Sequence, residues 1–289
     1  MKQIVTTAII ILVFSFIACN ETKEQNLSSK KEIKKNFTEK QKVVDILKSI
    51  ETGATEPVSY INPDKYIQHN LTIEDGLEGF GAVLDMLPPN TAKVNTVRVF
   101  QDGDFVFTHT DYNFFGPKIG FDIFRFEDGE IVEHWDNLQE TPKKLNPSGY
   151  SMIDGPTKVS NTNKTEVNKI LVKDFVKEIL INGKFKKLSK YFNGNEYIQH
   201  NPQISDGLSG LMQALENLAS QGIMIKYEKI HRVLGEGNFV LVVSEGKFGK
   251  KLTSFYDLFR VENGKIKEHW DVIETIPPRT EWKNENGKF

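Results

Sequence analysis

A histidine and an aspartate stand two positions apart at the end of a stretch that the chain contains twice. Ten of its sixteen positions are identical between FDIFRFEDGEIVEHWD at 121–136 and YDLFRVENGKIKEHWD at 256–271. Side chains alternate between the two faces of a strand, so the histidine and the aspartate of each EHWD share a face. These pairs are His134 with Asp136 and His269 with Asp271. An imidazole beside a carboxylate is a candidate acid/base pair.

A second duplicated box precedes each of these stretches. YIQHNLTIEDGLEG starts at Tyr66, YIQHNPQISDGLSG starts at Tyr197, and the two agree at ten of fourteen positions. The box adds further polar side chains, namely His69, Asn70, Asp75, His200, Asn201 and Asp206. The offset between copies is 131 at this box and 135 at the other, as expected of a duplicated domain with small loop changes. We therefore interpret the chain as a tandem repeat.

The residue types suit acid/base chemistry. A carboxylate in a mostly apolar pocket has a raised pKa, and a nearby imidazole or amide can stabilise an oxyanion or enolate. The set suits proton abstraction next to a carbonyl and, equally, activation of a water. Two alternatives stay open. In one, the EHWD residues are structural and the aspartates bind backbone amides or an arginine such as Arg125 or Arg260. In the other, two histidines and one carboxylate form a facial metal triad.

Neighbouring residues have simpler structural interpretations. Asp75 and Asp206 precede a glycine and a helical pattern, which is typical of a turn and a helix N-cap. Trp135 and Trp270 are expected to pack between a sheet and a partner surface. The chain has no G-x-S-x-G, H-E-x-x-H, P-loop or paired cysteines, so nucleophilic serine or cysteine catalysis has no support.

The elements that carry these boxes predict an α+β fold. Thr38 and Gly53 bound one helix, and a second helical pattern through 80–87 ends at Pro88. Strands follow at 94–100 and 105–111, and then a hairpin turning at Asp128-Gly129. The second half repeats this order with a helix at 165–182, a helix ending near 220, and strands at 223–234, 238–245, 252–261 and 265–276. Helices followed by an antiparallel meander disfavour doubly wound nucleotide folds.

The first residues predict export. An apolar run from Ile4 to Ala18 follows Lys2 and is too short to span a membrane comfortably, which is typical of a signal peptide. The run stops at Cys19, the only cysteine, and a polar stretch follows. This resembles a bacterial lipoprotein signal, in which the cysteine is diacylated. A cleaved secretory peptide with an incidental cysteine is the alternative. We expect a lipid-anchored protein of the bacterial cell envelope, periplasmic or surface-exposed.

The order of helices, YIQHN box, meander and EHWD hairpin resembles the SnoaL-like polyketide cyclase family of the nuclear transport factor 2-like (NTF2-like) superfamily. The predicted division is a signal peptide (1–18), a flexible tether (19–36), one SnoaL-like domain (37–140), a linker (141–164), a second SnoaL-like domain (165–277) and a C-terminal tail (278–289). A net charge of −2, with no basic stripe, argues against a nucleic-acid partner.

The resemblance implies two tandem cone-shaped α+β barrels, each with helices followed by a curved antiparallel sheet around an apolar pocket. It also implies that an aspartate acts as general base in an aldol condensation without metal or cofactor. That role falls on Asp136 and Asp271, with His134 and His269 beside them. The implied substrate-binding residues are His69, Asn70, His200 and Asn201, reaching in from the helical side, with half-buried Tyr66 and Tyr197.

The expected ligand is a small apolar or carbonyl-bearing molecule, and the expected activity is of the cyclase, isomerase or hydrolase kind. A non-catalytic envelope binding protein and a purely structural or interaction module are the alternatives. Relatives often dimerise through the outer face of the sheet. We therefore also expect the two domains to form an intramolecular pseudo-dimer that buries Trp135 and Trp270.

Overall fold

The computed structural model describes residues 37–87 and 91–289. Residues 38–289 form one compact unit. The predicted signal peptide, Cys19 and the tether lie outside the described residues. Within the described residues, none of the helices combines the length and the apolar character that crossing a bilayer requires.

The first half begins with helices and ends with a four-stranded meander. Its elements are α2 (Glu39–Thr52), a 3₁₀ turn η1 (Glu56–Tyr60), β1 (Ile67–Gln68), α3 (Gly76–Met86), β2 (Lys93–Asp102), β3 (Phe105–Asn113), β4 (Pro117–Glu127) and β5 (Glu130–Glu140). The predicted caps of α2 are confirmed. The Thr38 side chain accepts a hydrogen bond from the amide of Gln41, and Gly53 takes the left-handed conformation with φ of 68°.

The second half repeats this order. It comprises η2 (Thr162–Lys164), α4 (Thr165–Phe175), η3 (Val176–Ile181), η4 (Phe185–Lys187), α5 (Leu188–Tyr191), β6 (Ile198–Gln199), α6 (Gly207–Ser220), β7 (Ile225–Glu236), β8 (Phe239–Phe248), β9 (Lys251–Glu262), β10 (Lys265–Thr275) and η5 (Arg279–Glu281). The single α-helix expected at 165–182 is wrong in one respect, because η3 is a π-helical turn.

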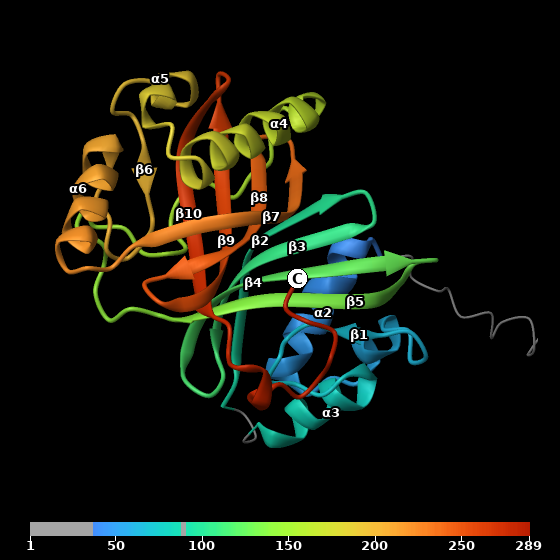
Figure 1. The fold of residues 1–289 in the computed structure, drawn as a ribbon. Helices are drawn as coiled ribbons and strands as arrows, with labels where there is room; N and C mark the ends of the chain where they lie inside the picture. The colour runs from blue at the N-terminus through green and yellow to red at the C-terminus, as the bar shows by residue number, and fades with distance from the viewer. Residues whose placement is uncertain (1–36, 88–90) are drawn as a thin grey trace, which may run out of the picture. The chain divides into compact units, whose positions relative to one another are not determined.

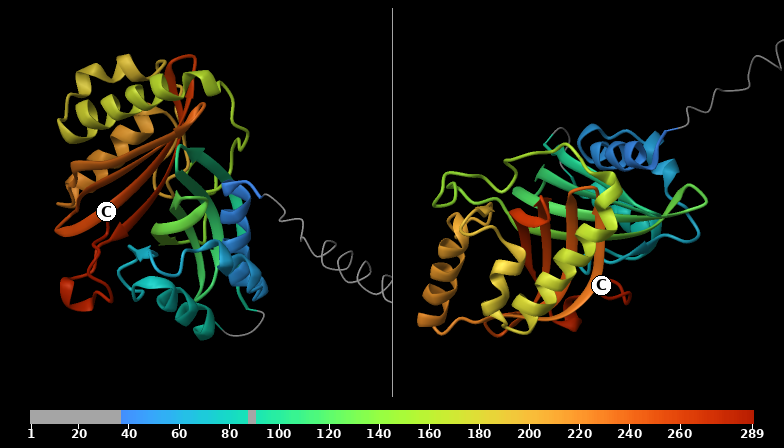
Figure 2. Two further views of the ribbon diagram at one scale, coloured as in Figure 1. Left: turned by 90° about the vertical axis from the view of Figure 1, so that its right-hand side faces the viewer. Right: turned by 90° about the horizontal axis from the view of Figure 1, so that it is seen from above.

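The two sheets have equivalent strand orders. The first is β1-β5-β4-β3-β2 and the second is β6-β10-β9-β8-β7. Figures 1 and 2 show both as strongly curved sheets, with α4 crossing the second one. Neither sheet closes on itself, so each half is an open cone rather than a complete barrel. The α+β class and the duplication are confirmed.

The β4–β5 hairpin contains a bulge that sequence reasoning did not predict. Asp128 and Gly129 have positive φ values of 52° and 81°, as a two-residue turn requires. Beyond the turn the register shifts by one residue between Arg125 and Phe126. Asp122 therefore pairs with Asp136, whereas an unbroken ladder would place it opposite Trp135. The β9–β10 hairpin has the same shift next to Ile266, so Asp257 pairs with Asp271.

The outer faces of the two sheets share one hydrophobic core. It contains Trp135 (2% exposed) and Trp270 (0% exposed) together with apolar residues from both halves. The Arg232 guanidinium lies 4.0 Å from the Trp135 ring, and that of Arg98 lies 4.4 Å from the Trp270 ring. Each tryptophan thus contacts an arginine of the other half. That this packing corresponds to the dimer of related proteins stays a prediction.

Asn137 provides a test of the contact between the halves. Its buried side-chain amide donates to the carbonyl oxygens of Ser254 (3.1 Å) and Val272 (2.7 Å) in the other sheet. We expect Asn137→Ala to lower the free energy of unfolding by about 1–3 kcal/mol, because two buried carbonyls lose their donor. Urea denaturation measures this, with the exposed Asn113→Ala as control. Equal stability of the two variants would contradict a close contact between the sheets.

Candidate active site

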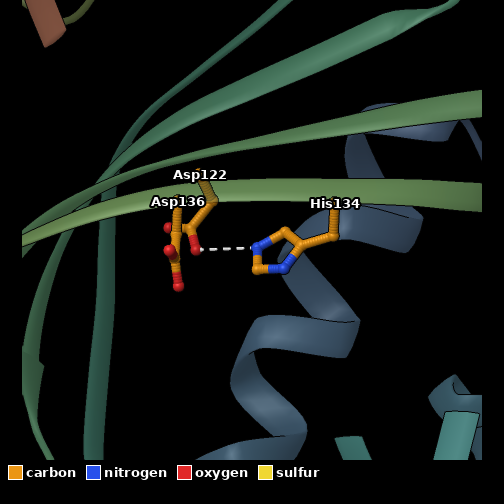
Figure 3. Close-up of side chains that lie close together, drawn as sticks. All are labelled: Asp122, His134 and Asp136. Atoms are coloured by element: carbon orange, nitrogen blue, oxygen red, sulfur yellow. Dashed lines mark hydrogen bonds and ion pairs between the residues drawn. The ribbon is translucent and has the colours of Figure 1, made fainter. Parts of the chain in front are cut away.

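A two-residue parallel pairing brings the two duplicated boxes together. β1 pairs with β5 so that Gln68 lies beside His134, and β6 pairs with β10 so that Gln199 lies beside His269. His134 lies on the same face of β5 as Asp136, as predicted. Figure 3 shows its imidazole against the carboxyl groups of Asp122 and Asp136.

Both ring nitrogens of His134 contact oxygen atoms. Nδ1 lies 3.1 Å from Oε1 of Gln68, and Nε2 lies 3.2 Å from Oδ1 of Asp122. Oε1 of Gln68 also accepts the backbone amide of Asn70, which fixes it as an acceptor. Nδ1 must therefore carry a hydrogen. The Nε2 contact needs a second hydrogen, on His134 or on Asp122, so a proton is held between these two residues.

The other oxygen of Asp122 is fixed by a phenol. The Tyr112 hydroxyl donates to Oδ2 of Asp122 at 2.6 Å. Burial, reinforced by the neighbouring Asp122, raises the pKa of Tyr112 well above its usual value, so the phenol stays protonated. Tyr112 thus orients Asp122 toward His134.

Asp136 is held by an amide and keeps one oxygen without a hydrogen bond. Asn70 donates from Nδ2 to Oδ2 of Asp136 at 2.6 Å, while its own Oδ1 accepts from Thr72. These contacts fix the direction of the Asn70 amide. Oδ1 of Asp136 is buried and accepts no hydrogen bond. An oriented carboxylate with one oxygen free of hydrogen bonds, close to the proton between Asp122 and His134, is suited to proton transfer.

The second half repeats the arrangement. His269 contacts Oε1 of Gln199 and Oδ1 of Asp257, each at 3.0 Å. Asn201 donates to both oxygens of Asp271, at 3.0 and 2.7 Å. Burial raises the pKa of Asp271, and the nearby Asp257 acts in the same direction.

The first constellation lies at the wall of an apolar cavity. The cavity has a volume of about 260 Å³, and Asp122, His134, Asp136, Asn70 and Tyr66 line part of it. The rest of its wall is mainly apolar and includes Ile46, Leu47, Ile50, Phe80, Val83 and Phe114. Polar groups converging in one part of an apolar hollow are typical of a small-molecule site.

The corresponding cavity of the second half is smaller, at about 80 Å³. Asp257, His269 and Asp271 line it, but Phe175 and Leu180 of the α4–η3 segment and two leucines of α6 also contribute to its wall. A more open groove of about 800 Å³ adjoins it and is lined in part by Asn201. None of the three acid/base residues lines that groove.

Two of the predicted pocket residues lie elsewhere. The ring of His69 stacks on Trp135 at 4.6 Å, and that of His200 stacks on Trp270 at 4.7 Å. Their Nε2 atoms contact Glu133 and Glu268 on the outer face of each sheet. This corrects the expectation that both histidines reach into the pockets. In each YIQHN box the histidine and the asparagine follow the two-residue strand and contact opposite faces of the sheet. Tyr66 and Tyr197 line the cavities but are buried rather than half-buried.

The arginine contacts considered in the structural alternative for the aspartates do not form. Arg125 and Arg260 pair through Nε with Glu133 (2.6 Å) and Glu268 (2.7 Å), and not with the EHWD aspartates. Asp75 and Asp206 occupy N-cap positions, but their side chains make no capping hydrogen bond. They accept the backbone amides of Gln68 and Gln199 instead, at 2.9 Å each.

Sequence reasoning missed several members of the site. These are Asp122, Gln68 and Tyr112 in the first half and Asp257, Gln199 and Tyr227 in the second. The aspartates and glutamines are identical in the duplicated boxes, and that identity was the available signal. The tyrosines lie outside both boxes and gave no such signal.

The residues present could also offer ligands to a metal ion. Asp122, His134 and Asp136 each provide a ligand atom, all within 4.8 Å of one another. The two-histidine triad considered from the sequence does not converge, because His69 lies on the other face. In the arrangement seen, both nitrogens of His134 are engaged with oxygens, which is the pattern of a proton-carrying network.

No family model matches the chain, and no curated protein matches it. Several solved structures match part of the chain. The NTF2-like protein of unknown function from Cytophaga hutchinsonii is 15% identical with a TM-score of 0.33, and the match covers 37% of this chain and 95% of that one. IdmH from Streptomyces antibioticus, a proposed polyketide cyclase, is 18% identical with a TM-score of 0.32, covering 36% and 93%. An LEH-like epoxide hydrolase from M. tuberculosis is 24% identical with a TM-score of 0.29, covering 38% and 85%.

A variant of Glu268 tests whether the residues on the outer face of the sheet stabilise the fold. Burial would raise its pKa, but hydrogen bonds from His200 and Arg260 outweigh burial and lower it. A lowered pKa adds stability above the unfolded-state pKa, and this is lost as pH falls through the folded-state pKa. We expect Glu268→Gln to cost about 3–5 kcal/mol at neutral pH and progressively less in acid. Urea denaturation across pH measures this.

The matched control is Glu262→Gln, since Glu262 pairs with the same Arg260 but is exposed. Its cost should be about 0–1 kcal/mol. A pH-independent cost of Glu268→Gln would contradict the assignment.

One of these three solved structures is named NTF2-like, and the three matches cover between 36% and 38% of this chain.

Proposed function

We propose that the first cavity binds a small, largely apolar, carbonyl-bearing molecule. Asp136 takes a proton from one atom of this molecule and returns it to another. The observation that carries this proposal is the position of Asp122, His134 and Asp136 in the wall of the 260 Å³ cavity. The size and apolar wall favour a compact lipophilic ligand. The reaction class is isomerisation or cyclisation through an enolate.

In the proposed step, Asp136 acts as the base and the Asp122–His134 pair supplies the acid. Oδ1 of Asp136 takes a proton from the carbon next to the carbonyl, and the electron pair of that C–H bond moves into the enolate. The proton held between Asp122 and His134 is available to the enolate oxygen. Asn70 and Gln68 keep the carboxylate and the imidazole in place. Asp136 then returns its proton to a different carbon of a conjugated enolate and the oxygen-bound proton goes back to the Asp122–His134 pair, which completes an isomerisation; return to the same carbon gives exchange.

Deuterium exchange tests the step without knowledge of the natural substrate. The protein is incubated in heavy water with 1-tetralone, a bicyclic ketone, and loss of the α-proton signal is followed by NMR. We expect Asp136→Asn to slow the catalysed exchange by about 10²–10⁴-fold, the usual contribution of a positioned base. The exposed Asp104→Asn is the matched control and should exchange at the parent rate.

Ligand binding separates an enzyme from a carrier. Saturation of the chemical shifts of residues lining the first cavity shows whether 1-tetralone enters it. Binding without exchange in the parent protein would favour the alternative, a non-catalytic envelope protein that captures a ligand in the same cavity. Equal exchange rates in the parent and Asp136→Asn would rule out Asp136 as the base.

We also propose that the chain is exported and anchored through lipid on Cys19. The support is the sequence alone: an apolar run ending at the only cysteine, followed by a polar stretch. Expressed in a bacterium fed an alkyne-tagged fatty acid, the full chain should acquire the tag and sediment with membranes. Cys19→Ser should lose both properties, whereas Ser28→Ala should keep them. A tag retained by Cys19→Ser would contradict the anchor.

A further inference from the structure

The segments that follow each sheet contain a short motif in common. NPSGYS at 146–151 and NENGKF at 284–289 share an asparagine in first place and a glycine in fourth. Both glycines have positive φ, 89° at Gly149 and 80° at Gly287. We call residues 146–151 the first clasp and residues 284–289 the second clasp. The duplication therefore extends into regions predicted as linker and tail.

Each clasp covers the YIQHN box of the other half. In the first clasp, Asn146 donates to the carbonyl oxygens of Gln199 (2.6 Å) and Ile204 (3.2 Å). In the second clasp, Asn284 donates to those of Asn70 (2.8 Å) and Ile73 (2.9 Å). The C-terminal segment thus packs against the YIQHN box of the first site, although none of its residues lines the cavity.

The clasps also bind the outer-face histidines. Nδ1 of His200 contacts the carbonyl oxygen of Ser151 at 2.9 Å, and Nδ1 of His69 contacts that of Gly287 at 2.8 Å. These two contacts come from the sixth and the fourth clasp position, so the register rests on other contacts. Asn146 Oδ1 accepts the amide of Ser148 at 3.0 Å, Asn284 Oδ1 accepts that of Asn286 at 3.1 Å, and the positive-φ glycine follows one residue later in both clasps. Lys288 is therefore the counterpart of Tyr150.

At this fifth position the two clasps differ chemically. Tyr150 lies beside His200, with ring centroids 5.3 Å apart. Lys288 instead enters the protein and is only 4% exposed. Its ammonium lies 3.7 Å from Oδ1 of Asp136 and 2.8 Å from Oε2 of Glu274. Burial alone would lower the pKa of Lys288, but these carboxylates outweigh it and raise the pKa, so the ammonium stays charged.

The two aspartates consequently have different surroundings. Asp136 has one oxygen bound to Asn70 and the other facing the ammonium of Lys288. Asp271 has both oxygens bound to Asn201 and no cation from the first clasp. The half with the charged lysine is also the half with the larger cavity. The first half thus has both the lysine charge next to its aspartate and the larger of the two cavities.

We propose that Lys288 is a positioning residue that holds Asp136, through their ion pair, in the wall of the first cavity, so that the C-terminal clasp makes the first site the working one of the pair. This rests on the proposed function only in treating Asp136 as a base. The lysine acts through Asp136, since it does not line the cavity itself.

Several other groups act on Asp136, and the effect of Lys288 must be separated from theirs. They are His134 on β5, Asp122 on β4, Tyr112 on β3, Tyr66 before β1, Tyr256 on β9 and Glu274 on β10. Among these groups and Lys288, only Lys288 and His134 can be cationic. His134 has an equivalent in His269, so it does not distinguish the two halves.

The test measures the titration of the Asp136 and Asp271 carboxyl groups in the ligand-free protein. Aspartate is labelled with ¹³C at the side-chain carboxyl carbon, and Asp136→Asn identifies the signal of Asp136. We expect this carboxyl to protonate at a higher pH in Lys288→Met than in the parent, with the Asp271 signal unchanged. The control is Lys283→Met, an exposed lysine of the same C-terminal segment.

Lys288→Met leaves Glu274 without its partner and is expected to be less stable. The double variant Lys288→Met/Glu274→Gln removes both charges, and glutamine keeps an acceptor for the amide of Leu138. The Asp136 signal should still titrate at a higher pH than in Glu274→Gln alone. Identical titration curves in these two folded variants would overturn the proposal. Because no ligand is used, that result is independent of whether 1-tetralone exchanges.

Discussion

The parallel pairing of Gln68 with His134, repeated between Gln199 and His269, determines which side chains meet in each half. Two residues of β1 suffice to attach the YIQHN box to the edge of β5. Once attached, the glutamine faces the histidine and the asparagine faces the aspartate. Without this pairing, an imidazole and two carboxyl groups would be buried without the amides that orient them, which is costly in an apolar interior.

The hairpin bulge adds the second acid. A one-residue shift in register moves every side chain beyond it to the opposite face. The shift next to Phe126 therefore brings Asp122 onto the inner face opposite Asp136 and leaves Trp135 on the outer face. The same irregularity thus creates the acid/base cluster inside and the tryptophan contact between the sheets outside. That both hairpins carry it explains why the two halves share their chemistry and their mode of packing.

The sequence predicted what depends on local signals. Helix caps at Thr38 and Gly53, the Asp128-Gly129 turn and the shared face of His134 and Asp136 follow from short-range rules, and all three are observed. The side to which His69 points was not predictable, because it depends on β1 ending after two residues. Burial of Lys288 was not predictable either, since a lysine next to the last residue of a polar segment usually lies in solvent.

Differences between the halves arise from contacts distant in sequence. The second cavity is smaller than the first although helices line both, α4–η3 and α6 in the second and α2 and α3 in the first, and only packing shows which side chains turn inward. The first cavity receives its nearby cation from residue 288, more than a hundred positions after Asp136. Equivalent boxes therefore do not imply equivalent sites. The larger of the two cavities beside an acid/base cluster and the nearby lysine both belong to the first half.

A crystal structure with 1-tetralone bound tests the central claim most directly. The account predicts the ketone inside the first cavity, with its α-carbon against Oδ1 of Asp136 and its oxygen near His134 and Asp122, and no ketone within the second cone. A ketone held only in the open groove beside Asn201, or a first cavity that stays empty at saturating ketone, would contradict it.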